Sequence, residues 1–385
     1  MPLKPEQTIP QEARLGPRND VERRLVNIWQ TVLDISPIGV RDDFFDLGGH
    51  SLLAARLSAA IHEEFGANLP LAVLFEAPTV ERMAEILGRK DEPVGWTSLV
   101  AVQTSGSQLP LYLISGAGGN VIRFHDLAKY LGDDQPVYAL QPPGLDGNQA
   151  FLTHVDGLAE YFIKEIRKAQ PHGPYHIVGY SFGGFVAFEM ASQLKAQGEL
   201  PGLVGLLDTE EWNYGVRAYK SRPFAERLRA YRSNIRELFF GHDRWNYLKR
   251  KIQMRVSAAL FTIARALGQP LPQWIGTIED VNRFAAAHYS PKLYTGRLTV
   301  FRAAPDRASM DSQLGWGRVA TEVEVHEITG DHNEITEEPH VRVLAAKLSR
   351  SLHETNLARE QSRRAAPAAE DARDPSLVGA HLPPL

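Results

Sequence analysis

The segment HIVGYSFGGFVAFEM, residues 176–190, constrains the fold of this chain more than any other. An apolar, strand-like run precedes Ser181, and a helix-like run follows it. Gly179, Ser181 and Gly183 fit the pattern Gly-x-Ser-x-Gly, in which small residues allow a sharp turn from a strand into a helix. A serine at such a turn is a candidate nucleophile. The alternative is a serine that caps a helix at a glycine-rich turn.

Short apolar runs alternate with helical segments between residues 111 and 353. Most of these runs are rich in β-branched or aromatic residues, as strands are. Strands that alternate with helices form a parallel sheet covered on both faces, so we predict an α/β domain with a mostly parallel sheet. Strands are predicted at 111–115, 136–140, 175–180, 203–208, 298–302 and 322–328, and helices at 125–132, 156–170 and 185–198.

A serine nucleophile needs a base, and the base needs an acid that orients it. Of the 13 histidines, His332 is the candidate base, because it follows the last predicted strand, where folds of this kind place it. His326 lies within that strand and His340 starts the next helix, so both are expected to be structural. Two carboxylates remain open for the acid. Asp208 ends one predicted strand, and Asp306 follows a later one.

Residues 18–88 have the pattern of a small all-helical bundle. Apolar residues recur at helical spacing in 21–33 and 52–65, and Thr79 is placed to cap a third helix at 80–87. No strand is predicted before residue 96.

Ser51 lies in DLGGHSLLAAR, residues 46–56, at the start of the second of these helices. A serine there is first of all a helix cap. The free N–H groups and the dipole of a helix start also favour a phosphate ester, so Ser51 is a candidate for covalent modification.

The composition excludes several classes of function. The 385 residues suffice for two or three domains, and the net charge of −4 gives no argument for a nucleic-acid partner. The absence of cysteine excludes disulfides, thiolate metal sites and a cysteine nucleophile, and we expect no metal. No apolar run is long enough to span a membrane, and the polar, proline-rich start lacks the core of a secretory signal. We therefore expect a cytoplasmic enzyme of bacterial type.

Three segments interrupt this pattern. Residues 89–110 mix charge, glycine, serine and proline, which predicts a linker running into an edge strand, and residues 354–385 are expected to be a disordered tail. Residues from about 210 to 290 have the pattern of helical, strongly basic segments, which predicts a lid over a site. Their charge would serve either a solvated face, the favoured interpretation, or an anionic substrate. Four aromatic residues of this segment would shape either an acyl pocket or a core: Trp212, Tyr214, Trp245 and Phe261.

Residues 18–88 resemble the peptidyl carrier domain of a nonribosomal peptide synthetase. The resemblance rests on DDFFDLGGHSLLA (42–54), FGANLPLAVLFEAPTV (65–80) and the closing helix. It implies that Ser51 carries a covalent 4′-phosphopantetheine arm. The Gly-Gly-His before Ser51 favours a peptide carrier over a fatty-acid or polyketide carrier.

Residues 99–353 resemble the thioesterase that terminates such an assembly line, an α/β-hydrolase with a helical lid. In that family the acid often follows the strand right after the nucleophile helix, as the aspartate of a Leu-Leu-Asp string, which here is Leu206-Leu207-Asp208. The resemblance assigns the oxyanion hole to the backbone amides of Phe182 and Ala117. The chain departs from the family where the loop often begins His-Pro, because it has Ser115-Gly116 there.

Together the two resemblances imply a carboxy-terminal carrier–thioesterase didomain that releases a peptidyl thioester by hydrolysis or macrocyclisation, in antibiotic or siderophore biosynthesis. A phosphopantetheinyl transferase and upstream condensation and adenylation domains are the implied partners. Two rivals remain open: a polyketide-type carrier–thioesterase, and a docking module with an inert hydrolase domain.

Overall fold

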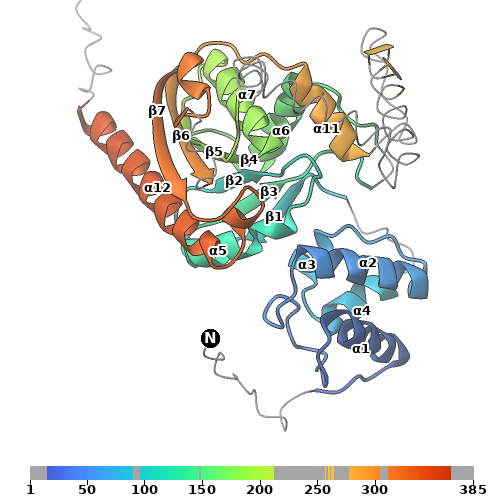
Figure 1. Ribbon diagram of the computed structural model, residues 1–385. Coiled ribbons are helices and arrows are strands. Elements are labelled where there is room, and N and C mark those ends of the chain that lie inside the picture. The colour runs from blue at the N-terminus through green and yellow to red at the C-terminus, as the bar shows by residue number, and fades with distance from the viewer. Residues whose placement is uncertain are drawn as a thin grey trace, which may run out of the picture.

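The computed structural model describes residues 15–89, 96–146, 149–211, 256, 259–260, 262–263, 277–303 and 311–365. Within them, a group of helices precedes a seven-stranded sheet that is flanked by helices (Figure 1). No helix of these residues is both long and apolar enough to cross a membrane.

The amino-terminal helices confirm the predicted bundle, with α1 (Asp20–Leu33), α2 (Ser51–Phe65), α3 (Val73–Glu76) and α4 (Val80–Gly88). Side chains of Asn19 and Thr79 accept hydrogen bonds from first-turn amides of α1 and α4, as predicted for Thr79. Buried apolar residues of the four helices form one core around Trp29 and Phe44. The sequence did not predict α3, because four residues are too short to show a helical period.

The sheet has the strand order β1-β3-β2-β4-β5-β6-β7. Strands β2 to β7 run parallel, and β1 pairs antiparallel with β3 at one edge. This arrangement confirms the predicted fold class. The strands are β1 (Leu99–Gln103), β2 (Leu111–Ile114), β3 (Val137–Leu140), β4 (Tyr175–Tyr180), β5 (Pro201–Leu207), β6 (Tyr294–Ala303) and β7 (Ala320–Ile328).

Helices cover both faces of the sheet (Figure 1). One core holds α6 (Val155–Ala169) and α7 (Phe182–Ala196), and a second core on the other face holds α5 (His125–Leu131) and α12 (His340–Ala365). Helix α11 (Ile278–Ala287) contacts α7. The chain leaves β2 toward α5 and leaves β4 toward α7. The carboxyl ends of β2 and β4 therefore form the switch point at which open α/β sheets bind ligands.

The expected disordered tail at 354–385 is wrong in its first part, since α12 continues to Ala365. The sequence of this part, HETNLAREQSRRA, is rich in good helix formers, and Leu352 and Asn356 anchor the helix on the sheet. Residues 366–385 lie outside the described residues.

The predicted linker at 89–110 contains the edge strand β1, so part of it belongs to the sheet. Strand β1 forms because LVAVQ is rich in strand-forming residues and pairs with β3. Of the predicted lid, the structure describes α11 with the few residues that flank it and a few residues before residue 264. Trp212, Tyr214, Trp245 and Phe261 all lie outside the described residues.

The bundle contacts the sheet domain through stacked rings. Phe45 stacks on His125, with centroids 3.9 Å apart and planes 9° apart, and Phe75 stacks on Phe45 at 5.6 Å. Ile122, in the 3-10 turn η2 (Ile122–Phe124), is buried together with the bundle core. Because η2 follows the loop after β2, the bundle lies beside the carboxyl edge of the sheet.

Candidate active site

Ser181 occupies the turn between β4 and α7 with a φ of 53° and a ψ of −118°. Few residues other than glycine adopt this backbone, and such strain is concentrated at functional sites. The flanking glycines make the turn possible. A Cβ on Gly179 would overlap the backbone of Gly183, and a Cβ on Gly183 would overlap the carbonyl of Ile114. The turn is therefore packed closely against β2.

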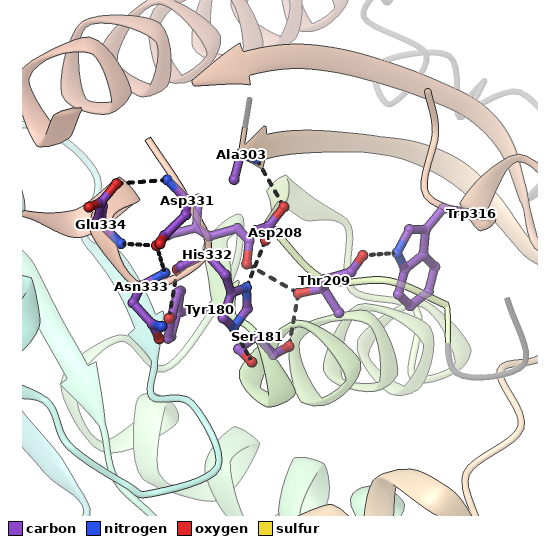
Figure 2. Close-up of polar contacts among 11 residues, drawn as sticks. Tyr180, Ser181, Asp208, Thr209, Ala303, Trp316, Asp331, His332, Asn333 and Glu334 are labelled. Carbon is purple, nitrogen blue, oxygen red and sulfur yellow. Dashed lines mark hydrogen bonds and ion pairs between the residues drawn. The ribbon is translucent and has the colours of Figure 1, made fainter. Parts of the chain in front are cut away.

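Three of the predicted side chains form one hydrogen-bonded row (Figure 2). Nε2 of His332 lies 3.0 Å from Oγ of Ser181, and Nδ1 of His332 lies 2.7 Å from Oδ2 of Asp208. The Asp208 side chain is fully buried, and its Oδ1 accepts the amide of Ala303 at 2.9 Å. An Nδ1–H donated to Asp208 leaves Nε2 free to accept a proton from the serine. The alternative acid, Asp306, lies outside the described residues.

Two further residues, which the sequence did not reveal, secure the row from the side of β5. The hydroxyl of Thr209 donates to the carbonyl of Ser181 at 2.8 Å, and Nε1 of the buried Trp316 donates to the carbonyl of Thr209 at 2.7 Å. The amide of Ser181 donates to Leu207 at 2.9 Å. These bonds fix the turn relative to the strand that carries Asp208. Trp316 is remote in sequence, and no local pattern connects it with the serine.

The loop after β7 presents His332 through bonds of its own (Figure 2). Gly330 has a φ of 88°, which allows the chain to turn directly after the strand. Oδ1 of Asp331 accepts the amides of Asn333 and Glu334 at 2.8 and 3.1 Å, and Oε2 of Glu334 accepts the amide of Asp331 at 3.0 Å. The loop is thereby closed on itself, with the imidazole directed at Ser181.

A cavity of about 890 Å³ opens over the serine. Ala117 and Phe182, the predicted oxyanion residues, both line it. The carbonyl of Ala117 accepts Nδ2 of Asn282 at 2.8 Å, which ties the loop after β2 to α11. Charged residues also face the cavity: Arg123, Glu210, Glu211, Glu279 and Arg283.

Ser51 is the first residue of α2 and is half-buried. His50 precedes it in extended conformation and makes no capping hydrogen bond with its side chain, whereas α1 and α4 have side-chain caps. The first turn of α2 also carries no acidic residue. This helix start is therefore suited to an anion on the serine.

Comparison with known families and proteins identifies both parts of the chain. Residues 109–352 match the family described as Thioesterase domain. The chain belongs to the thioesterase family. Residues 23–87 match the family described as Phosphopantetheine attachment site. The chain is thus a carrier domain followed by a thioesterase domain, and its carrier domain takes a covalent 4′-phosphopantetheine.

The relatives are large synthetases. The chain is 31% identical over 371 residues to the chondramide synthase cmdD of Chondromyces crocatus, covering 91% of this chain and 9% of that protein. It is 41% identical over 193 residues to the dimodular nonribosomal peptide synthase of Bacillus subtilis, covering 50% of this chain and 8% of that protein. A solved four-domain nonribosomal peptide synthetase, AB3403, shares the fold over 88% of this chain and 26% of its own, with 24% identity and a TM-score of 0.51. The chain therefore spans less than a tenth of these two curated relatives.

Proposed function

We propose that this thioesterase releases an acyl group from an arm on Ser51 through an ester on Ser181. The observation that carries the proposal is the row Ser181–His332–Asp208, with its distances of 3.0 and 2.7 Å. The residues around Ser51 fit a phosphopantetheine, because the uncapped start of α2 offers its amides to the phosphate. When bound, that group presents the acyl chain as a thioester.

In the acylation step, Oγ of Ser181 attacks the acyl carbonyl carbon while Nε2 of His332 takes the serine proton. Asp208 holds the imidazole in the required tautomer and stabilises its positive charge. The backbone amides of Phe182 and Ala117 stabilise the oxyanion, a contribution that is typically worth about 2.7–4 kcal/mol per donor. The carbon–sulfur bond then breaks, His332 returns the proton to the leaving thiolate, and the acyl group remains as an ester on Ser181.

In the second step, His332 removes a proton from the group that attacks this ester. Attack by water gives a free acid, and attack by an amine or hydroxyl of the acyl chain gives a ring. In both cases Ser181 leaves with the proton that His332 returns.

The relatives support a peptidyl substrate and a role in nonribosomal peptide biosynthesis. We infer that condensation and adenylation domains act upstream of this chain. A phosphopantetheinyl transferase would load Ser51. This proposed role in biosynthesis implies that the protein acts in the cytoplasm.

The test starts from the chain loaded on Ser51 with a peptidyl phosphopantetheine. It measures release of the peptide and identifies the product by its intact mass. Ser181→Ala should abolish release, whereas Ser192→Ala, on α7 with its hydroxyl bonded to Phe188, should not. Ser51→Ala should prevent loading but spare hydrolysis of a soluble thioester. Ser58→Ala, on the same helix as Ser51, should load normally. Unchanged release by Ser181→Ala would mean that the domain is an inert docking module.

A further inference from the structure

Tyr180 links β4, which leads into the nucleophile, to the loop that carries the base. It is the last residue of β4 and directly precedes Ser181. Its side chain belongs to the core on the α5 and α12 face. Its hydroxyl donates to the backbone carbonyl of His332 at 2.9 Å (Figure 2). Ser181 is thus hydrogen-bonded to the side chain of His332, and its neighbour Tyr180 is hydrogen-bonded to the backbone of the same histidine.

The ring of Tyr180 also contacts His332. The two rings stack with centroids 5.2 Å apart and planes 27° apart. The guanidinium carbon of Arg123 lies 3.9 Å from the Tyr180 ring centroid. The imidazole therefore stacks on a ring that also contacts the guanidinium of Arg123, and this ring limits the rotation of the imidazole.

The hydroxyl of Tyr180 is a dependable donor. Burial raises its pKa above the usual value, with the charge of Arg123 acting against this. The phenol therefore stays protonated at neutral pH, and the carbonyl of His332 keeps its partner. The internal bonds of the loop shape residues 330–334, but among the described hydrogen bonds it is the one from Tyr180 that joins the backbone of His332 to β4.

We propose that Tyr180 is a positioning residue for the general base, which sets the distance from His332 to Ser181. The inference rests on the proposed function, because it needs His332 to act on Ser181. A catalytic base has to be held within hydrogen-bond reach of the proton it takes, and misplacement by about 1 Å can cost up to about 10²-fold in rate.

A matched control lies on the same strand. Tyr175 is also buried in β4 and donates its hydroxyl to a backbone carbonyl, that of Pro171, at 3.1 Å. Its bond is at the opposite end of the strand and does not touch His332. Tyr180→Phe and Tyr175→Phe therefore remove the same group from two buried rings of one strand, and only the first removes a hydrogen bond to His332.

The experiment measures hydrolysis of hexanoyl N-acetylcysteamine thioester by the full chain, with active serines counted by a fluorophosphonate. Tyr180→Phe should lower kcat per active serine about tenfold and leave KM nearly unchanged. Tyr175→Phe should match the wild type. The downfield proton resonance of the imidazole Nδ1–H should broaden or move only in Tyr180→Phe.

The proposal is overturned if Tyr180→Phe keeps kcat within about twofold of the wild type, or if both variants lose activity equally. Because kcat is expressed per active serine, a slower reaction at each active site can be distinguished from a smaller fraction of folded protein. The Ser181→Ala variant distinguishes failure of the proposed function from failure of the positioning role alone. If it stays active, the proposed function is wrong, and if only Tyr180→Phe resembles the wild type, the positioning role alone is wrong.

Discussion

Asp208 binds His332 with one carboxylate oxygen and the amide of Ala303 with the other. Both oxygens of the buried carboxylate are thus engaged, one by the imidazole and one by β6. Strand β6 therefore helps to orient Asp208, while Ser181 lies directly after β4 and His332 lies after β7.

This arrangement predicts the effect of removing the charge of Asp208. Asp208→Asn should lower kcat by about 10⁴, because the amide favours the wrong imidazole tautomer and cannot stabilise the imidazolium. The measurement is hydrolysis of a soluble thioester by the full chain. Asp306→Asn is the control, since Asp306 is the other carboxylate that the sequence leaves open. A reversed order of effects would assign the acid to Asp306.

The packing of the nucleophile turn predicts that α7 does not tolerate a methyl group at Gly183. Its Cβ would overlap the backbone of Ile114 and Ser115. Gly183→Ala should therefore destabilise the sheet domain by about 1–3 kcal/mol in urea unfolding and abolish activity. Gly157→Ala, in α6, meets no atom within 4 Å and should stabilise it by about 0.5–1 kcal/mol. Equal effects would contradict the packing argument.

A buried histidine predicts how stability changes with pH. Burial lowers the pKa of His176 to about 4, and its Nδ1 accepts the amide of Leu203 at 2.9 Å. The unfolded chain, with a pKa near 6.5, binds the proton more readily, so stability is lost as the pH falls from about 6.5 toward 4.

The sheet domain should therefore be about 2 kcal/mol less stable at pH 5 than at pH 7 through this group. Urea unfolding at the two pH values measures the difference. His176→Gln should be less stable at pH 7, where it loses the fitted ring, but should show a smaller change between the two values. An unaltered pH dependence in this variant would assign the effect to other groups.

The stacked rings between the domains predict a separation of two activities. His125→Ala removes the partner of Phe45 and should slow release from the loaded arm about 2–10-fold, the equivalent of one aromatic contact. Hydrolysis of a soluble thioester should not change, because His125 does not line the cavity over Ser181. His172→Ala, with an 89% exposed side chain on the same domain, is the control. A slower reaction with the soluble substrate would place His125 in the active site instead.

The features that could be predicted from the sequence are those marked by a local pattern of residues or by the order of elements along the chain. The turn at Ser181 is marked by its glycines, and His332 by its place after the last strand. The bond from Tyr180 to His332 spans 152 positions, and that from Trp316 to Thr209 spans 107, so neither leaves a periodic trace. The continuation of α12 was missed because its charged, polar sequence is equally typical of disorder, and only its contacts with the sheet decide between the two.

The stacking of Phe45 on His125 joins two domains of one chain. The fraction of time that the two domains spend in contact therefore depends on their effective local concentration and not on the concentration of the protein. A short connection gives two domains an effective concentration on the order of millimolar. A contact too weak to hold separate molecules together is then enough to bring the carrier back after each departure. Under the proposed function, in which Ser51 carries the arm, the same weakness should let the carrier leave the thioesterase domain quickly for its next loading.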